Sequence, residues 1–319
     1  MATPIPADAP YENIPCNLCG ADDTIERIPS TLSPDESDDW RMYACTSGGY
    51  GHHGPIVQCK QCGFVYASPR RQSGDVLEIY ETVKDPLYLE ERQGRILTFE
   101  RHLKPMEAFT GPAQQRRLLD VGAYTGIFVN IAQRHGWDAL GIEPSEWAVN
   151  EARMQGLTMQ LGTLENAELP DAHFSVVTMW DVIEHVPDPR RTLEAAWRVL
   201  EPGGYLIIHT MDIDSLFSRL LGKHWPWYME MHLFYFSRRT LSAMLNDVGF
   251  NIVWMGAQGR YLQAGYLASR VTALMPWLGK PVEWAIDKLN MRSRPVRVNL
   301  GDLFTTYAQK PASGSLPIP

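Results

Sequence analysis

The chain has 319 residues and a mass of 36.1 kDa, which suits one large domain plus a smaller accessory unit. Its apolar fraction of 45%, net charge of −8 and pI of about 5.6 exclude a dedicated nucleic-acid binder and a polybasic membrane binder. No run of about 18 apolar residues occurs, so no membrane span is predicted. The first residues lack the apolar core of a signal peptide, so we expect a cytoplasmic protein. Its five cysteines are then thiolates or metal ligands rather than disulfides.

Changes in composition divide the chain into consecutive stretches. The first residues are rich in proline and offer little that could pack, whereas the next stretch contains all the cysteines and an acidic loop with Asp35, Glu36, Asp38 and Asp39. A helical pattern follows, and alternating strand and helix patterns come after it. We therefore predict a disordered lead-in at 1–15, a cysteine-bearing unit at 16–71, a helical lid or linker at 72–116, an α/β domain at 117–310 and a tail at 311–319.

The cysteine-bearing unit contains the pattern Cys-x-x-Cys-Gly twice. Two residues between cysteines let both thiolates face one metal ion, and the following glycine permits the tight turn in which backbone N–H groups stabilise the sulfur atoms. Four thiolates suit a closed tetrahedral Zn²⁺ site with a structural role. We predict such a site on Cys16, Cys19, Cys59 and Cys62. Two redox-active or free thiol pairs are the alternative.

The fifth cysteine, Cys45, stands outside both pairs and is either a buried small residue or, with His52 and His53, part of an alternative ligand set. Zinc ribbons often bind nucleic acid, but residues 1–75 contain five basic side chains against twice as many acidic ones. We therefore expect no nucleic-acid partner and predict that this unit holds the following helices over an active site.

From Arg117 onward, short apolar runs alternate with amphipathic helices, which is typical of βαβ units and a parallel sheet. Helices are predicted at 190–200 and 238–248, the second with Ser237 as its N-cap. The fold class is therefore α/β. The predicted strands are 117–121, 138–142, 157–161, 174–180, 204–209, 251–256 and 302–309.

Two segments do not fit a minimal α/β sheet. Residues 211–236 are rich in aromatic residues and histidine, and residues 259–298 carry helix-like apolar stripes. The second segment is expected to be a helical insertion before the last strand. It would act as a substrate cap, a homodimer surface or a membrane-surface patch, and Trp277, Leu278 and Trp284 would suit an interface.

A glycine-containing loop follows the first predicted strand of this domain. In Asp120-Val-Gly122-Ala-Tyr-Thr-Gly126 the glycines permit a sharp turn and close approach of a ligand to the backbone. The next strand ends at Glu143, whose carboxylate can accept hydrogen bonds from a ribose diol. Phe128 stands where close approach of a pyrophosphate would be needed, so the pattern favours a nucleoside ligand without a diphosphate.

Residues 117–212 resemble the core of class I S-adenosylmethionine-dependent methyltransferases. The resemblance rests on LLDVGAYTG at 118–126, GIEPS at 141–145, GTLENAELP at 162–170, FSVVTMWDVIEHVPDP at 174–189 and LEPGGYLIIHT at 200–210. Tyr124 stands at the middle glycine of the usual family loop. The resemblance implies a doubly wound, seven-stranded Rossmann-like sheet with the strand order 3-2-1-4-5-7-6. The paired cysteines, FVYASPR and HLFYFS also resemble a bacterial subgroup that carries an N-terminal zinc unit and includes enzymes methylating carbon or oxygen of sugars and other small molecules.

The resemblance also implies positions for S-adenosylmethionine. The methionine part of this cofactor would lie on Asp120, Gly122, Ala123, Tyr124 and Gly126, and the ribose on Glu143 with Pro144 beside it. Thr163 and Leu164 would flank the adenine, and Asp181 would face the sulfonium.

His232 is the predicted general base, because it lies in an aromatic stretch after the fifth strand and an imidazole has a pKa near neutrality. A histidine that packs against the next helix is the alternative. Tyr228 and Tyr235 either orient a substrate hydroxyl or belong to the core. Asp181, Glu184 and His185 either pack at the top of the sheet or bind a divalent metal.

The leading hypothesis is a methyltransferase that acts on carbon or oxygen of a sugar, polyketide-like or lipid-like small molecule. One alternative is a metal-assisted O-methyltransferase that acts on a catechol or quinone precursor. The other is a non-catalytic scaffold that binds the cofactor for assembly or sensing. His185 and Asp181 would take over the role of base if His232 did not fill it.

Overall fold

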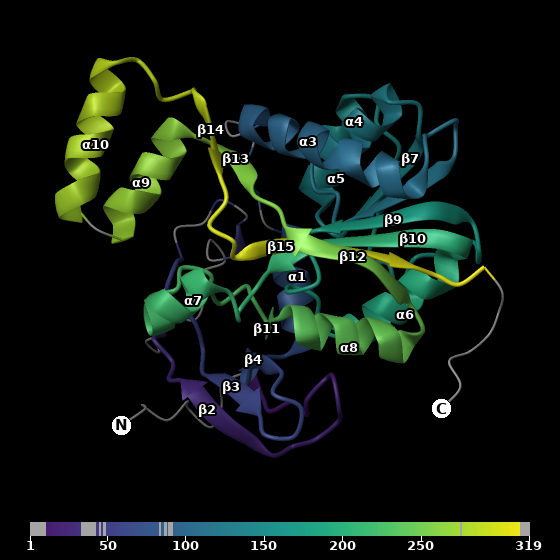
Figure 1. Cartoon of the computed structure of the whole chain (residues 1–319), viewed down its shortest axis with the longest axis horizontal. Coiled ribbons are helices and arrows are strands. Elements are labelled where there is room, and N and C mark those ends of the chain that lie inside the picture. The colour runs from purple at the N-terminus through teal and green to yellow at the C-terminus, as the bar shows by residue number, and fades with distance from the viewer. Residues whose placement is uncertain are drawn as a thin grey trace.

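The computed structural model describes residues 11–32, 43, 44, 46, 49–82, 84, 85, 88, 92–274 and 276–312. Figure 1 shows a central sheet between two layers of helices, a small N-terminal sheet below them, and a pair of helices that projects from one side. Predictions for Asp35, Glu36, Asp38, Asp39 and Cys45 concern residues outside the described ranges. Within those ranges, no helix is both long and apolar enough to cross a membrane.

The central sheet of the described residues has the strand order β12-β15-β10-β9-β6-β7-β8, which confirms the predicted order 3-2-1-4-5-7-6. β15 runs antiparallel to both its neighbours, whereas the pairs from β10 to β8 are parallel. The parallel arrangement brings the carboxyl ends of these strands to one edge of the sheet. The strands are β6 (Arg117–Val121), β7 (Asp138–Glu143), β8 (Met159–Leu161), β9 (Phe174–Trp180), β10 (Leu200–Met211), β12 (Asn251–Ala257) and β15 (Leu303–Gln309).

Helices cover both faces of the sheet, as a doubly wound fold requires. In Figure 1, α3, α4 and α5 lie on one face and α6 and α8 on the other. The α8 prediction was correct at both ends: Ser237 caps the helix, and Gly249 ends it at a φ of 112°. The helices are α1 (Ser73–Thr82), α3 (Arg92–Thr110), α4 (Ile127–Arg134), α5 (Glu146–Met154), α6 (Pro189–Val199) and α8 (Arg238–Val248).

The buried core has one part on each face of the sheet. On one face, Phe128 and Ile131 of α4 pack with Leu103 and Met106 of α3. The cluster on the other face contains buried side chains of α6 and α8, namely Leu193, Leu241, Met244 and Leu245. The same cluster continues into the N-terminal unit through Cys16, Phe64 and Tyr66. The cysteine-bearing unit therefore shares its core with the α/β domain.

The N-terminal unit forms a four-stranded antiparallel sheet in the order β11-β4-β3-β2 within the described residues. Its strands β2 (Thr24–Ile28), β3 (Ile56–Cys59) and β4 (Val65–Ala67) come from the unit itself. The fourth strand, β11 (Phe234–Tyr235), comes from the segment after β10, and Phe234 lies opposite Tyr66. A further antiparallel pair joins β1 (Tyr11–Glu12) to β5 (Arg70–Arg71).

The two extra segments have structures of their own. After β10 come α7 (Leu216–Leu221) and the 3-10 helix η2 (Gly222–His224). The insertion contains the predicted helices, α9 (Ala264–Leu274) and α10 (Pro276–Lys288), but it also has an antiparallel ribbon of β13 (Arg260–Gln263) and β14 (Pro295–Val298) that the sequence did not indicate. β13 is half-buried at all four residues and shows no alternation, whereas β14 alternates exposed and half-buried residues but is only four residues long and begins with proline.

The bounds of two strands were wrong by two residues or more. The third strand begins at Met159 rather than at residue 157, because the Leu157 amide donates to the carbonyl of Ala152 at the end of α5. The fifth strand runs from Leu200 to Met211 rather than over 204–209, because it pairs with β9 before the glycine turn and with β15 up to its last residue.

Truncation of Leu241 tests the packing of α8. This side chain is completely buried, so Leu241→Ala should lower the free energy of unfolding by about 2–5 kcal/mol, through lost burial and the remaining cavity. Met154→Ala, at a 74% exposed position, should change it by less than about 0.5 kcal/mol. Chemical denaturation followed by circular dichroism measures both. Equal midpoints for the two variants would contradict the packing described above.

Candidate functional site

The glycine loop connects β6 to α4 at the carboxyl edge of the sheet. Gly122 and Gly126 have φ values of 65° and 73°, and a Cβ atom at either position would lie 2.6 Å from a neighbouring side chain, Val182 or Leu157. The amides of Gly122 and Ala123 both donate to the carbonyl of Ile142 in β7. Both glycines are therefore required by backbone conformation and by close packing.

Tyr124 takes the place of the middle glycine of the usual loop. It has a φ of 49°, the left-handed region that a non-glycine residue adopts only at a cost in energy. Its ring is buried, with the ring centroid of Tyr88 at 4.4 Å and that of Trp147 at 5.9 Å. The loop thus keeps the conformation of the glycine pattern, and aromatic packing compensates for the backbone strain.

Two buried carboxyl groups flank this loop. Glu143 accepts hydrogen bonds from the amides of Tyr124 at 3.0 Å and Ser145 at 2.9 Å, one on each carboxylate oxygen. Asp120 accepts a hydrogen bond of 2.7 Å from the hydroxyl of Thr178. Burial raises the pKa of each carboxyl group to about 7. Each oxygen of Glu143 keeps acceptor capacity, so the carboxylate fits a ribose diol.

The remaining predicted cofactor residues lie at the same edge of the sheet. The amide of Gly162, just before Thr163, donates to the carbonyl of Glu143. Leu164 is buried, whereas Pro144 and Thr163 are half-buried. The register of β7 and β8, with Glu143 opposite Leu161, brings these residues together.

Asp181 follows β9 and has a φ of 56°, so a second non-glycine residue at this edge is in the left-handed region. Its Oδ1 lies 3.2 Å from Nη2 of Arg260 and 3.9 Å from Nε2 of His209. Burial acts to raise the pKa of Asp181, but Arg260, with His209 and Arg95, outweighs it, and the net shift is downward. Asp181 is therefore an ionised carboxylate facing cations.

Several buried polar atoms near Asp181 have no hydrogen-bond partner among the described residues. They are Nε1 of Trp180, Nε2 of His209, Nδ1 of His102 and Nε of Arg260. The rings of His102, Trp180 and His209 lie against one another, with centroids 5.1 to 6.2 Å apart. Buried polar atoms without partners are costly and cluster where a protein binds a polar ligand. This arrangement fits a bound cofactor and acceptor.

His185 and His232 form a pair beside this cluster. Their ring centroids are 4.7 Å apart. Nδ1 of His185 lies 2.9 Å from the carbonyl of Met231, and Nδ1 of His232 lies 2.7 Å from the carbonyl of Trp227. Since a carbonyl oxygen only accepts, Nδ1 carries the proton in each ring and Nε2 keeps its lone pair. Burial lowers the pKa of His185 to about 4 and that of His232 to about 3, so both rings are neutral near pH 7.

Comparison with known proteins identifies this arrangement. A family model described as a methyltransferase domain matches residues 88–254, which is more than half of the chain. The chain belongs to this methyltransferase family.

Curated relatives align with the methyltransferase core. A ubiquinone biosynthesis O-methyltransferase of Alkalilimnicola ehrlichii is 34% identical over 109 residues, which cover 32% of this chain and 44% of that protein. The enzyme of the same name from Methylococcus capsulatus is 36% identical over 104 residues, covering 30% and 44%. The chain thus matches less than half the length of these relatives.

Among solved structures, a SAM-dependent methyltransferase from Archaeoglobus fulgidus has a TM-score of 0.49 and 20% identity, covering 71% of this chain and all of the other. A complex between the Haloferax volcanii Trm112 methyltransferase activator and a methyltransferase gives a TM-score of 0.49 at 17% identity, covering 72% and 100%.

The two tyrosines considered for the acceptor site of the methyltransferase are core residues. Tyr228 and Tyr235 are both buried, and their rings lie 5.3 Å apart. The hydroxyl of Tyr235 donates to the carbonyl of Met229 at 3.3 Å, and burial raises the pKa of this phenol. Because this hydroxyl is bonded to the backbone of the loop before His232, it orients that loop rather than an acceptor.

The structure changes the predicted acidic and histidine cluster. The described residues group Glu184, His185 and His232, whose ligand atoms all lie within 4.8 Å of one another, whereas Asp181 is paired with Arg260. Burial raises the pKa of Glu184 to about 8, and the charge of Asp181 adds to this shift. The pair of histidines with one carboxyl group, rather than Asp181, Glu184 and His185, is therefore the candidate set for a metal.

Sequence reasoning missed Arg260, His209 and His102. His209 had a signal, because a histidine near the end of an otherwise apolar strand is unusual in a buried sheet. Arg260 had none, because it lies on the ribbon that returns from β12 to the site, and nothing local in the sequence indicates that return. His102 lies on α3, whose position over β9 depends on packing.

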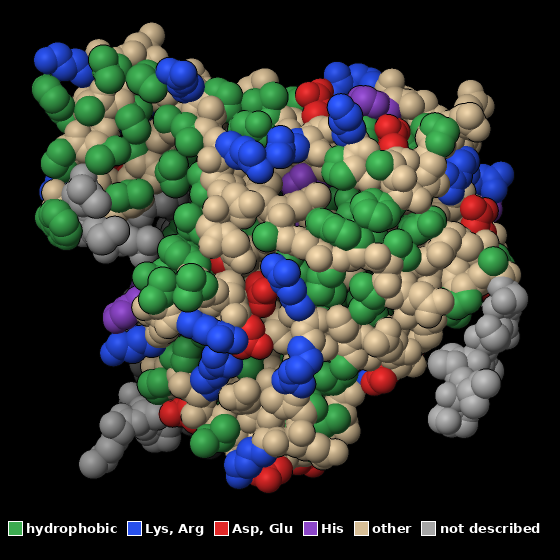
Figure 2. All heavy atoms as spheres, in the orientation of Figure 1, with side chains coloured by type: hydrophobic (Ala, Val, Ile, Leu, Met, Phe, Trp, Pro, Cys, Tyr) green, Lys and Arg blue, Asp and Glu red, His purple; other side chains and the backbone are tan. Residues whose placement is uncertain are grey.

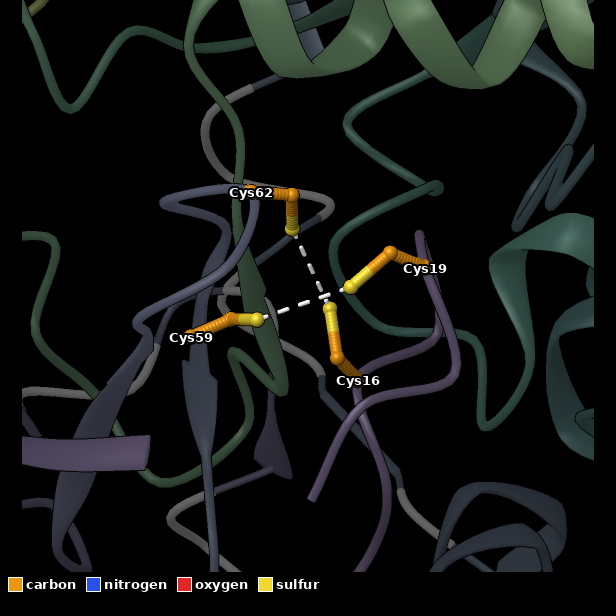
Figure 3. Close-up of side chains that lie close together, drawn as sticks. All are labelled: Cys16, Cys19, Cys59 and Cys62. Carbon is orange, nitrogen blue, oxygen red and sulfur yellow. Dashed lines mark hydrogen bonds between the residues drawn. The ribbon is translucent and has the colours of Figure 1, made fainter. Parts of the chain in front are cut away.

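The side chains of the four paired cysteines lie close together in the N-terminal unit. Figure 3 shows their sulfur atoms converging from two loops. The Sγ atoms of Cys16 and Cys62 are 3.4 Å apart, and those of Cys19 and Cys59 are 3.5 Å apart. Tetrahedral coordination with Zn–S bonds of about 2.3 Å places sulfurs roughly 3.8 Å apart, so the donor set fits zinc.

The two cysteine loops share one geometry. In each, the amide of the glycine after the second cysteine donates to the carbonyl of the first, at 2.7 Å for Gly20 and 2.9 Å for Gly63. Both glycines have a φ near 75°. Side chains from the methyltransferase core bind these loops: Arg190 at the start of α6 donates to the carbonyl of Leu18, and Arg239 at the start of α8 donates to that of Cys62.

Proposed function

We propose that this methyltransferase transfers a methyl group to an oxygen of a hydroxyl-bearing small molecule, with His232 as the general base. The observation that carries the proposal is the orientation of His232: its Nδ1 is hydrogen-bonded to a backbone carbonyl, and its Nε2 is free of a proton. The names of the curated relatives support oxygen as the acceptor atom. The acceptor would be a sugar, polyketide-like or lipid-like molecule, and methylation of such a molecule at carbon is one alternative.

The glycine loop and the ends of β7 and β8 are proposed to hold the cofactor. When bound, S-adenosylmethionine supplies an electrophilic methyl group on a positively charged sulfur. Glu143 would accept hydrogen bonds from the ribose hydroxyls, and the backbone of the loop would lie against the methionine part. The full set is Asp120, Gly122, Ala123, Tyr124 and Gly126 for methionine, Glu143 and Pro144 for ribose, Thr163 and Leu164 for adenine, and Asp181 near the sulfonium.

The charges around the site explain how a weakly basic histidine can act. The acceptor oxygen gains the methyl group and loses its proton to Nε2 of His232. Protonation of a buried imidazole is costly, but the ionised Asp181 acts to raise the pKa of both His232 and His185. Once a substrate covers this edge of the sheet, water is excluded and this attraction strengthens. Asp181 therefore supports the base instead of replacing it, whereas the neighbouring His185 acts to lower the pKa of His232.

A metal-assisted O-methyltransferase is the second candidate. The grouping of Glu184, His185 and His232 within 4.8 Å favours it, because both imidazoles keep Nε2 free while Nδ1 is held by a carbonyl, as metal-binding histidines require. A divalent cation at these residues would lower the pKa of an acceptor hydroxyl. A catechol or quinone precursor would suit such chemistry. Metal-dependent activity would separate this mechanism from general-base catalysis.

Replacement of His232 tests the base. His232→Asn should lower kcat by about 10²–10⁴ and leave the affinity for S-adenosylhomocysteine unchanged, because the side chain acts on the acceptor proton. His224→Asn, at an exposed histidine near the same loop, is the matched control. Activity is measured on an acceptor found by screening small molecules with labelled cofactor. A near-normal kcat for His232→Asn would exclude the assignment.

The pH profile of the same reaction gives an independent readout. Because burial lowers the pKa of His232 to about 3 in the protein without acceptor, its ring stays neutral well below pH 6.5, and kcat/KM for the acceptor at saturating cofactor should not fall near pH 6.5. A histidine with an ordinary pKa would instead lose activity near pH 6.5.

Cofactor affinity should depend on pH through Glu143. Its pKa of about 7 means that the carboxyl group is protonated in more acidic solution, and a ribose diol needs the ionised form as acceptor. The affinity for S-adenosylhomocysteine should therefore fall by up to about tenfold per pH unit below pH 7. Glu143→Gln should reduce this dependence to the part that is due to Asp120 and weaken binding at pH 8 by roughly 1–3 kcal/mol, whereas Glu146→Gln should do neither. Calorimetry measures all three proteins; a pH-independent wild type would refute the ribose assignment.

We further propose that Cys16, Cys19, Cys59 and Cys62 hold one structural Zn²⁺, which would lock the two cysteine loops together. These loops are joined to α6 and α8 through Arg190 and Arg239, and β4 of the same unit pairs with β11 directly after His232. In this proposal the unit of residues 16–71 holds the segment with the general base in place. The helices of 72–116, proposed as a lid, would complete the cover.

Purified protein should contain about one zinc ion per chain, measured by elemental analysis. Cys59→Ser should abolish binding and increase proteolysis within residues 16–71 before the α/β domain unfolds. Cys45→Ser is the control, and it should keep the metal if Cys45 is not a ligand. Zinc-free protein from cells grown with ample zinc would overturn the proposal.

A further inference from the structure

The helix α10 presents tryptophan and lysine side chains on one exposed face. Trp277 is 77% exposed and Trp284 is 64% exposed. They are seven residues apart, so they lie on the same side of the helix. Lys280 and Lys288 are exposed on that side too, by the rotation of about 100° per residue. Nζ of Lys288 lies 4.8 Å from the ring centroid of Trp284. This set of four residues is called the α10 face below.

A second exposed apolar patch lies on α7. Leu216 and Leu220 are 73% and 74% exposed, and Arg219 and Lys223 beside them are exposed as well. Figure 1 shows α7 and the α9–α10 pair on the same side of the molecule, and Figure 2 shows apolar side chains gathered over both regions. Apolar side chains exposed to this degree, leucines on α7 and tryptophans on α10, indicate a surface that binds a partner.

The charge of the insertion is opposite to that of the whole chain. Residues 259–298 contain seven lysines and arginines and two acidic residues, a net charge of +5, in a chain of net charge −8. One of the two acids, Asp287, is paired with Arg292, with a contact of 2.8 Å between Oδ2 and Nη2. Within α10 itself, Lys280 and Lys288 stand beside Glu283 and Asp287, so the excess of positive charge lies on the rest of the insertion. Together with Arg219 and Lys223 of α7, it favours an anionic partner surface.

We propose that the α10 face and α7 bind the surface of a bilayer that contains anionic phospholipid. Tryptophan prefers the headgroup level of a membrane, where its ring is buried and its N–H finds a partner. Lysines beside it keep their charge in the headgroups while their stems cover apolar surface. A second copy of the chain fits less well, because a symmetric dimer through this face would bring two positive faces together.

The position of the insertion connects this surface to the site. The ribbon at the base of the insertion carries Arg260, whose Nη2 lies 3.2 Å from Oδ1 of Asp181. The amide of Tyr261, the next residue, donates to the hydroxyl of Thr98 in α3 at 2.8 Å. Docking of the α10 face would therefore hold the carboxyl edge of the sheet close to the bilayer. The inference concerns membrane binding alone and stands whether or not His232 is the base.

Vesicle flotation with the full-length protein tests the proposal. The wild type should float with vesicles of phosphatidylcholine and phosphatidylglycerol, and it should bind vesicles of phosphatidylcholine alone at least tenfold more weakly. Lys280→Glu with Lys288→Glu should weaken binding to anionic vesicles by roughly thirtyfold or more, since each lysine at an anionic surface contributes about fivefold. Trp277→Ala with Trp284→Ala should weaken it by on the order of tenfold or more. Salt near 1 M should release the wild type, since the Debye length is then about 3 Å.

Two variants are matched controls at exposed positions on other elements: Lys104→Glu for the change of charge and Met154→Ala for the loss of apolar surface. Both should bind as the wild type does. S-adenosylhomocysteine affinity should be unchanged in all four variants, which separates this test from the cofactor assignment. Failure of the wild type to bind anionic vesicles, or equal binding to both vesicle types, would overturn the proposal. A dimer that dissociates in the double tryptophan variant, without vesicle binding, would assign the face to a second copy instead.

Discussion

The antiparallel pairing of β11 with β4 is the contact on which the arrangement of the site depends. Phe234 lies opposite Tyr66, and Tyr235 lies opposite Val65, so two residues directly after the His232 turn complete the sheet of the N-terminal unit. The amides of Leu233 and Phe234 also donate to the carbonyl of Glu184, next to His185. The segment after β10 is therefore held on one side by the cysteine unit and on the other by the loop after β9. These hydrogen bonds explain why the two histidines meet.

A buried ion pair strengthens the same joint. Nε of Arg71, at the end of the N-terminal unit, lies 3.1 Å from Oε1 of Glu230, and both side chains are buried. The hydroxyl of Tyr43 approaches the same carboxylate oxygen. Loss of one partner of such a pair leaves a buried charge without compensation, which costs about 3–5 kcal/mol. The pair therefore specifies one position for the residues just before His232, in addition to the continuous apolar core that links the two units.

The insertion connects the site to an exposed surface. Its ribbon reaches Asp181 through Arg260, and its helices carry tryptophans away from the sheet. Asp181 thus stays ionised because of a residue that lies 79 positions later in the chain. The arrangement lets one segment serve both the electrostatics of the site and the proposed contact with a lipid surface. Arg260 also lies over the ring of Trp227, 5.3 Å from its centroid, beside the carbonyl that holds His232.

The parallel sheet, the cofactor loop and the cysteine pairs follow from local patterns, whereas the order of the strands was implied by the resemblance to class I methyltransferases. Alternation of short apolar runs with amphipathic helices implies a parallel sheet, and right-handed connections leave few possible orders. The positions of Gly122 and Glu143 are set by their strands, because one comes directly after β6 and the other ends β7, and Gly126 stands directly before α4. The α8 bounds were predictable for the same reason: Ser237 and Gly249 are capping signals within the helix's own sequence.

Only the tertiary structure decided which side chains share the site with these residues. Arg260, His209 and His102 come from a ribbon, a strand and a helix that meet through packing between distant segments, and no local pattern records such contacts. The sequence likewise grouped Asp181 with Glu184 and His185. In the structure, His232 is the third member of that group. Sequence periodicity determines the helices and strands, because the spacing of side chains along them is local. Side chains on long connections are instead placed by the distant surface against which they pack.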